Sequence, residues 1–253
     1  MRTLDQLMPA LSARSVALSI MLGSHPPKLT ARDLVSLGAS FGISASTMRV
    51  ALSRMTAAGD LVAEDGAYVL AGRHLDRQVA TDRRIAIRRR PYDGMWRMAV
   101  VTGRGRDADA RASLRDSLTH ARLCELREGV WLRPDNIADL DLTEFDELET
   151  FATIPTDDRH LSRRLWDLNT WAAEARLLLD FLSSQHEPIE HLAAAAAAVR
   201  HLRTDPALPD ELLPERWPGD ELRWAYDDYR NNLTATHLSA VRDSERTERS
   251  TPR

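Results

Sequence analysis

Apolar and polar positions follow a helical spacing between Ser44 and Gly59. At about 100° per residue, one face of the predicted helix is apolar. It carries Met48, Ala51, Leu52 and Met55. The opposite face is short, polar and cationic, and it carries Ser46, Arg49, Val50, Ser53, Arg54 and Ala57. Ser44 is a favourable N-cap and Gly59 a favourable stop, so a helix is predicted over residues 45–58.

Elements on both sides of this helix complete a recognisable order. Residues 61–62 lead into the tight-turn signal Glu64-Asp65-Gly66, and residues 68–70 follow as a return strand. Upstream, residues 11–22 and a segment capped by Thr30 each have a helical apolar pattern. Three short helices followed by a hairpin are typical of a winged helix-turn-helix, in which the third helix reads DNA.

The polar face of the third helix suggests how DNA would be contacted. Short side chains let a helix enter a major groove about 12 Å wide, and two arginines can reach guanine edges or phosphates. The predicted DNA-contacting residues are Ser46, Thr47, Arg49, Val50, Ser53 and Arg54 in the helix, with Tyr68 in the wing. The alternative is an ordinary amphipathic helix whose arginines face water and a strand tyrosine that packs.

Downstream segments have other patterns. Residues 76–93 form an arginine-rich connector. Its arginines either lie along phosphates that flank the DNA site, or they belong to a solvated linker helix or to a surface for the acidic C-terminal part. Residues 94–157 predict the order βαββαβ, typical of a ferredoxin-like α/β sandwich. Its strands are expected over 95–101, 123–126, 129–132 and 150–154, and its helices over 107–121 and 136–148.

Residues 158–237 have a helical pattern, so the expected fold is α+β and multidomain, with a winged helix-turn-helix domain over residues 1–75 and an all-α C-terminal domain. One continuous apolar stripe comprises Leu161, Leu165, Leu168, Trp171, Ala175, Leu178 and Leu182. Six consecutive alanines, Ala193–Ala198, favour a further helix that packs closely. A proline-rich turn over 205–218 precedes a last helix over 219–233, and the tail over 238–253 is polar and expected to be disordered.

Composition and charge narrow the class of protein. The first 93 residues contain 13 basic and 8 acidic side chains, whereas the other 160 contain 21 basic and 30 acidic ones. A polyanion is therefore expected to bind the N-terminal part of the chain. The single cysteine permits no internal disulfide. No apolar run is long enough for a membrane span and the N-terminus does not resemble a signal peptide, so a cytoplasmic protein is expected.

Five segments carry a resemblance to a known family. They are MRVALSRMTAAGDLV, YDGMWRMAVV, LRDSL, GVWLRP and DPALPDELLPERWPGDELR, and the last is the most specific. In this order they resemble the PaaX-type bacterial transcriptional repressors of phenylacetic acid degradation, over nearly the whole chain. The resemblance implies a middle domain similar to a small CRISPR-associated nuclease, a homodimer on a palindromic DNA operator, and release by an aryl acyl-CoA thioester.

The chain departs from the family pattern in two places. Relatives often carry His and Arg where this chain has the alanine run, which leaves the identity of the effector open. The wing, EDGAYVLAG, is short and acidic, which predicts weak wing contacts. An acyl-CoA needs cations for its phosphates and an apolar slot. The candidates are Trp131, Arg133, Arg163, Arg164 and Trp166, although Trp in a core and Arg at a surface would have the same pattern.

Enzymatic function has little support. The sequence lacks a glycine-rich phosphate loop, a metal-spaced His or Cys cluster and a GxSxG turn, so no catalytic residue, metal or cofactor is predicted. A nuclease of the middle domain would need an acid at the end of its first strand, where Val101, Thr102 and Gly103 stand. Two alternatives stay open: a magnesium-dependent nuclease that uses Asp93, and a protein-interaction module that does not bind DNA.

Overall fold

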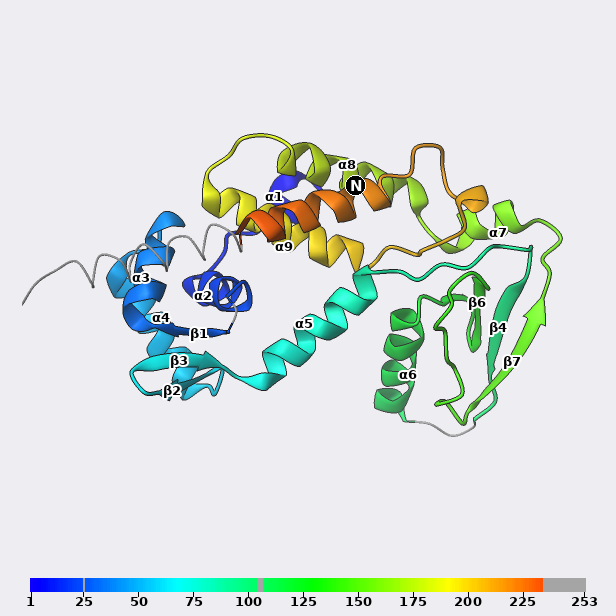
Figure 1. Cartoon of the computed structure of the whole chain (residues 1–253). Helices are drawn as coiled ribbons and strands as arrows, with labels where there is room; N and C mark the ends of the chain where they lie inside the picture. Colours follow the sequence, from blue (N-terminus) through cyan, green and yellow to red (C-terminus); the bar gives the residue numbers. More distant parts are fainter. Residues whose placement is uncertain (25, 104–106, 234–253) are drawn as a thin grey trace, which may run out of the picture. The chain divides into compact units, whose positions relative to one another are not determined.

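The chain forms two compact units in the computed structural model, which describes residues 1–24, 26–103 and 107–233 (Figure 1). The first unit contains residues 1–85, residues 174–203 and the described residues from 218 onward. The second contains residues 86–173 and 204–217. The chain therefore returns to the first unit within helix α8 (Leu168–Leu182). The tail expected over 238–253 lies outside the described residues.

Three capped helices open the first unit. They are α2 (Ala13–Leu22), α3 (Ala31–Ser40) and α4 (Ala45–Ala57), after a four-residue helix α1 (Leu4–Leu7). Each of the three begins after a hydroxyl side chain, on Ser12, Thr30 and Ser44, that accepts a hydrogen bond from a first-turn backbone N–H at 3.1–3.2 Å. These caps satisfy N–H groups that have no partner within the helix. The three predicted helices are confirmed.

A three-stranded antiparallel sheet follows the helices. Strands β2 (Leu61–Glu64) and β3 (Ala67–Leu70) form the predicted hairpin. Its turn has positive φ at both central residues, 48° at Asp65 and 77° at Gly66, which matches the twist of the strands. Strand β1 (Lys28–Thr30) pairs with the other edge of β3, in the order β1-β3-β2. With three residues, β1 is too short for an alternating pattern to predict.

The core of the first unit holds α4 by its apolar face. Met48, Leu52 and Met55 are at most 1% exposed and belong to one cluster with side chains of α2 and α3. Helices α3 and α4 approach so closely at Gly38 that an added Cβ would lie 2.4 Å from Met48 Cε. The turn between them contains Gly42 with φ of 71°, a conformation that favours glycine.

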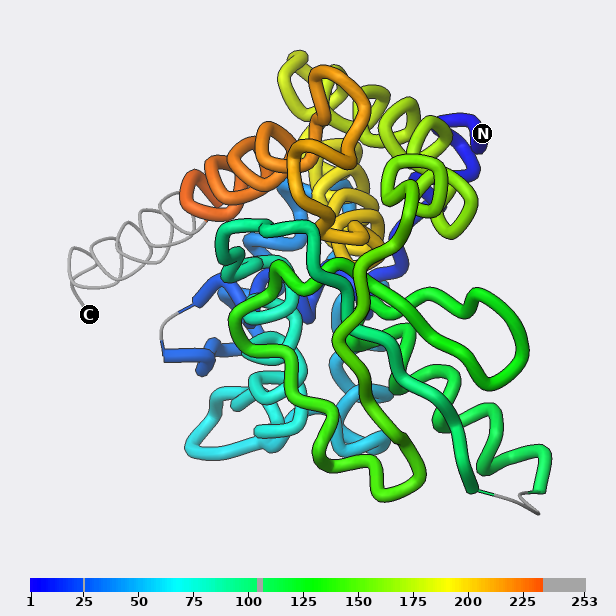
Figure 2. The backbone as a smooth tube through the Cα atoms, turned by 90° about the vertical axis from the view of Figure 1, so that its right-hand side faces the viewer, coloured from blue at the N-terminus to red at the C-terminus, as the bar shows by residue number. Residues whose placement is uncertain are grey.

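Four more helical segments complete the first unit. They are α5 (Gly72–Ile85), the end of α8, α9 (Pro188–Leu202) and the helix of residues 219–233. Figure 2 shows the N-terminal end of the chain beside α8, where Arg2 Nη2 lies 2.7 Å from Glu174 Oε2. Because α5 covers residues 76–85, more than half of the connector expected over 76–93 is helical.

The second unit is built on a four-stranded antiparallel sheet. Its strands are β4 (Trp96–Val101), β5 (Cys124–Arg127), β6 (Val130–Pro134) and β7 (Leu148–Thr153), in the order β5-β6-β4-β7. Helix α6 (Ala108–His120) packs on one face through Leu118. Helix α7 (Asp158–Leu165), the start of α8 and the short 3-10 helix η1 (Asp210–Leu212) contribute to the core on the other face, around Trp96.

Two expected elements are wrong. No helix forms over residues 136–148, because the Asp141 carboxylate accepts a hydrogen bond from the Thr143 backbone N–H at 2.9 Å, a local turn that competes with a helix. The continuous helix expected after Asp158 is broken, since Trp166 is extended with φ of −126° and ψ of 136°. The sheet thus keeps the strand order of a ferredoxin-like sandwich without its second helix.

A hydrogen-bond chain near the start of the second unit explains the aromatic residues of the YDGMW segment. Tyr92 Oη accepts from Trp96 Nε1 at 2.9 Å and donates to Asp158 Oδ2 at 2.9 Å. Burial, reinforced by the bond to Asp158, raises the pKa of Tyr92 to about 12. The phenol therefore stays protonated and connects β4 to α7.

Replacing Tyr92 with phenylalanine is expected to lower the free energy of unfolding of the second unit by about 1 to 3 kcal/mol, because the buried Trp96 indole N–H loses its acceptor. Five of the six tryptophans lie in this unit, so tryptophan fluorescence during urea unfolding measures the effect. Asp158→Asn, which keeps the Tyr92–Trp96 bond, should cost less. Equal stability of Tyr92→Phe and the wild type would contradict the assignment.

Candidate nucleic-acid interface

The polar face of α4 is exposed as the sequence predicted. Ser46, Thr47, Arg49, Ser53 and Arg54 are all exposed. Val50, on the same face, is 51% exposed. The two faces of the helix are separated as predicted, because Met48, Leu52 and Met55 occupy the core.

Arg49 and Arg54 have no hydrogen bond or ion pair to any residue that the structure describes. Both belong to the exposed face of a helix whose other face is fully buried. Two guanidinium groups that have no partner among the described residues are available to a polyanion, and either can donate two parallel hydrogen bonds.

Hydroxyl groups gather at the N-terminus of α4. Ser44 Oγ lies 3.0 Å from Ser46 Oγ and 2.8 Å from Thr47 Oγ1, and it also caps the helix. The N-terminal end of a helix carries partial positive charge and unpaired N–H groups, which suit a phosphate. The predicted positioning role of Ser46 and Thr47 is compatible with this location.

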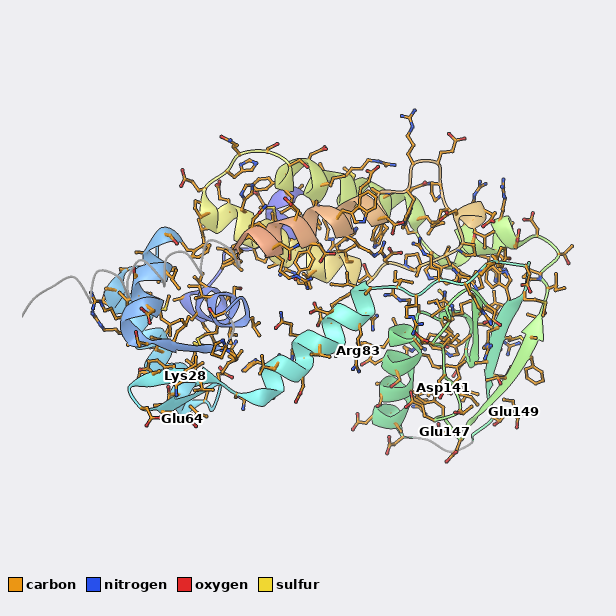
Figure 3. The ribbon with its side chains drawn as sticks, viewed as in Figure 1. Lys28, Glu64, Arg83, Asp141, Glu147 and Glu149 are labelled. Carbon is orange, nitrogen blue, oxygen red and sulfur yellow. The ribbon has the colours of Figure 1, made fainter. Side chains whose placement is uncertain are left out.

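The hairpin carries little positive charge. Its turn holds Glu64 and Asp65, and the neighbouring cation Lys28 lies 3.9 Å from Asp65 (Figure 3). Tyr68 lies in the central strand β3, where its half-buried ring packs against the core cluster. The packing alternative therefore accounts for Tyr68, and the acidic turn leaves α4 as the cationic surface of these elements.

Most arginines of the connector are used within their own unit. Arg73, which precedes the connector, binds Asp60, and Arg84 Nε of the connector donates to the Arg203 carbonyl at 3.0 Å. In the second unit, Arg88 and Arg90 pair with aspartates of the same unit. Among the described residues, the two exposed connector arginines without a partner are Arg77 and Arg83, both on α5. Figure 3 labels Arg83 on this helix.

A buried carboxylate joins the end of α4 to two other helices. Asp60 is 3% exposed; its Oδ2 accepts from Arg14 Nε of α2 at 2.8 Å. Its Oδ1 accepts from Arg73 Nη2 at 2.6 Å and contacts His74 Nε2 at 2.9 Å, both from α5. Burial alone would raise the pKa of Asp60, but the hydrogen bonds from Arg73, His74 and Arg14 outweigh it and hold the pKa well below its ordinary value.

Arg133, an expected effector contact, is enclosed. It is 0% exposed, and it donates to Asn136 Oδ1 at 2.9 Å and to the Ala207 carbonyl at 3.3 Å. Further bonds go to the carbonyls of Pro134 at 3.0 Å and Arg122 at 3.3 Å. This network holds the proline-rich segment on the sheet and leaves no surface of Arg133 for a ligand.

The other expected effector contacts do not form one site. Trp131 is 5% exposed and lies under the guanidinium of Arg115 at 5.9 Å. Trp166 packs on Trp96 with ring centroids 6.2 Å apart. The remaining two, Arg163 and Arg164, are exposed in the last turn of α7. The structure therefore does not bring the five residues together around a cavity.

The features that a metal-dependent nuclease would use are not assembled around Asp93. Its carboxylate accepts from the Met95 backbone N–H at 3.0 Å, in the turn before β4. Within the described part of the chain, no three His, Cys, Asp or Glu side chains are grouped to hold a metal ion. None of the helices described is both long and apolar enough to cross a membrane.

Three family models match the chain in sequence order. Residues 12–74 match the PaaX-like protein, residues 89–161 the PaaX protein central Cas2-like domain, and residues 168–241 the PaaX-like protein C-terminal domain. The chain belongs to the PaaX family. Family membership confirms the resemblance found in the five segments and the likeness of the middle domain to a CRISPR-associated protein. PaaX proteins are transcription regulators, which supports a role of this chain in transcription regulation.

A solved structure is similar to the chain over most of its length. The uncharacterized protein Rv0674 from Mycobacterium tuberculosis is 43% identical, and the match covers 91% of this chain and 99% of that one with a TM-score of 0.83. No curated protein matches the sequence.

Sequence reasoning missed the Asp60 cluster. Asp60 follows Gly59 at a helix end, where an acid usually faces solvent, and Arg14 lies 46 positions away. The alternation of apolar and polar residues contains no signal for such a contact. The neighbouring residues Arg73 and His74, which follow strand β3, were the one feature of the sequence that could have indicated a nearby acid.

Proposed function

We propose that this PaaX-family chain binds duplex DNA through a winged helix-turn-helix, with α4 as the recognition helix. The observation that carries the proposal is the pair Arg49 and Arg54, exposed and without a partner in the described part of the chain, on a helix whose other face buries Met48, Leu52 and Met55. Helices α3 and α4 are joined by a short turn that contains Gly42, which is the arrangement of a helix-turn-helix. The hairpin of β2 and β3 is the wing.

The proposed contacts divide into two kinds. Arg49 and Arg54 contact base edges or phosphates in the major groove, and Ser46, Thr47 and Ser53 position the helix through shorter hydrogen bonds. Val50 adds an apolar contact, for which a thymine methyl group is the natural partner. Tyr68, in the central strand, contributes through packing of the wing.

Replacing Arg49 or Arg54 with alanine is expected to weaken specific operator binding by about 1 to 3 kcal/mol, since either arginine can make a bidentate base contact. The measurement is a fluorescence-anisotropy titration with the DNA upstream of the protein's own gene, at several salt concentrations. If an arginine binds a phosphate instead, the slope of log K against log salt should become shallower by about one.

Arg127→Ala is the matched control, because it removes an exposed arginine from β5 in the second unit. It should leave operator affinity unchanged. Wild-type affinity in both Arg49→Ala and Arg54→Ala would exclude α4 as the reading helix.

The regulatory part of the proposal follows from the family. A cytoplasmic homodimer binds a palindromic operator, represses a catabolic operon, and is released by a small effector such as an aryl acyl-CoA. Family membership supports the regulation of phenylacetic acid catabolism. Release is a population shift: an effector that binds better to the DNA-free conformation lowers operator affinity by linkage. Footprinting with and without an acyl-CoA panel tests this, and unchanged protection across the panel would exclude that effector class.

A further inference from the structure

The first unit contains a cavity of about 790 Å³ among α2, α5, α9 and the helix of residues 219–233. These four helices can be followed in Figure 1. Its volume is within the range of small-molecule sites, about 300 to 1,000 Å³. None of the expected effector contacts lines it. It is instead formed by the helix that supports α4, the helix that follows the wing, and two C-terminal helices.

The walls of the cavity are largely apolar, and the alanine run provides its space. Leu18 and Leu22 of α2 and Leu192 and Val199 of α9 line it. Ala195 and Ala196 also line the cavity, whereas the other four alanines of the run are buried in packing. A larger side chain at Ala196, which is half-buried, would extend into this volume.

Polar side chains also line the cavity, among them Tyr229 and Arg77. Tyr229 Oη is buried and has no hydrogen-bond partner among the described residues, and burial raises the pKa of this phenol. A buried hydroxyl without a partner is costly, because it has lost its bonds to water. Arg77, an exposed lining residue, has no ion-pair partner in the described part of the chain.

We propose that this cavity binds the small-molecule effector, an amphipathic compound with an apolar aryl or short acyl body and an anionic or carbonyl group. The body lies between α2 and α9 beside Ala195 and Ala196. Its carbonyl or another acceptor takes a hydrogen bond from Tyr229 Oη after the ring of this lining residue turns toward the ligand, and Arg77 at the rim attracts the anionic part. Calling this ligand an effector rests on the proposed DNA-binding function. The proposal that the cavity binds the ligand does not.

The position of the cavity provides a route to DNA. Leu18 and Leu22 belong to α2, which shares its core with Met48 and Leu52 of α4. His74, which also lines the cavity, contacts Asp60 at the end of α4. A ligand that moves α2 or α5 therefore changes the support of the recognition helix. Both contacts lie within the first unit.

The test uses the full chain and a fluorescent amphipathic anion, 8-anilinonaphthalene-1-sulfonate, with aryl carboxylates and aryl acyl thioesters as competitors. Ala196→Trp fills the cavity and should weaken binding of the probe at least tenfold. Tyr229→Phe keeps the ring and removes the hydroxyl, and it should weaken a carbonyl-bearing competitor about fivefold. Ala80→Trp adds the same bulk to α5 at an exposed position outside the cavity and should bind as the wild type does.

Operator affinity without ligand should be the same in all three variants, and release by the competitor should be lost in Ala196→Trp. Wild-type ligand affinity in both cavity variants overturns the site while leaving the DNA proposal intact. Ligand binding that depends on the cavity in a protein without operator affinity supports the site and overturns the DNA function instead. Ligand binding that first appears after removal of residues 234–253 would assign the cavity to the chain's own C-terminal segment and overturn the proposal.

Discussion

Replacing Asp60 with alanine is expected to lower the free energy of unfolding of the first unit by about 3 kcal/mol. The carboxylate is buried, and its loss leaves Arg14, Arg73 and His74 without their common acceptor. The cost is near the lower end for a broken buried ion pair, because the side chains of Arg14 and Arg73 are 53% and 52% exposed and can turn to water. Circular dichroism during urea unfolding measures it.

The controls for Asp60→Ala separate charge from shape. Asp60→Asn keeps one acceptor oxygen and should cost about 1 to 2 kcal/mol. Asp76→Asn removes an exposed carboxylate from α5 and should change stability little. Operator affinity should fall in Asp60→Ala as well, since the end of α4 loses its connection to α2 and α5. Wild-type stability in Asp60→Ala would show that the three bonds contribute nothing net.

The same carboxylate should make stability depend on pH. The folded chain holds the pKa of Asp60 below its value in the unfolded chain, which is about 4. As the pH falls, the unfolded chain therefore binds the proton first, and its population rises. The stabilisation by Asp60 is complete above about pH 5 and is lost progressively below about pH 4. The stability difference between the wild type and Asp60→Asn should accordingly narrow between about pH 6 and pH 3.

Replacing Arg133 with alanine is expected to destabilise the second unit by about 3 to 5 kcal/mol. The guanidinium group donates to Asn136 and to three backbone carbonyls, and all of these acceptors would be left around a void. One of the carbonyls belongs to Ala207, in the segment that enters the sheet from the C-terminal part of the sequence. Tryptophan fluorescence during urea unfolding measures the loss.

Two substitutions sharpen the interpretation of Arg133. Arg133→Lys retains a charge but has one compact donor group, so it cannot reach acceptors in three segments and should also destabilise the unit. Arg127→Ala, the exposed control in the neighbouring strand, should have little effect. A loss below about 1 kcal/mol in Arg133→Ala would contradict the role of this network in holding the proline-rich segment.

The contrast between Arg133 and Arg49 shows what a sequence pattern can predict about arginines. Arg49 lies in a helix whose apolar face is defined by four neighbours at helical spacing, so its exposure follows from local periodicity. Arg133 lies in a strand beside Trp131, and its burial depends on Asn136 and on Ala207, which is 74 positions away. The same residue type therefore has opposite environments for reasons at different distances along the chain.

The cavity illustrates the same limit. The alanine run predicted a closely packed helix, and α9 confirms it. Local propensity determines that helix, but the space beside Ala196 exists because α2, α5 and the helix of residues 219–233 meet there. The five residues expected to bind an effector shared a composition, Trp beside Arg, and composition does not determine which side chains converge.

The sequence by itself determined the helices α2, α3 and α4 and the hairpin that follows them, the order of the strands along the middle segment, and the exposed cationic face of α4. Caps, turn residues and apolar spacing act between near neighbours, so they can be read along the chain. Tertiary structure alone decided the strand β1, the loop in place of a second sandwich helix, the Asp60 and Arg133 networks and the cavity. Each of these depends on side chains that are far apart in the sequence. Once buried together, such side chains must satisfy one another's hydrogen bonds, or they enclose a space between them.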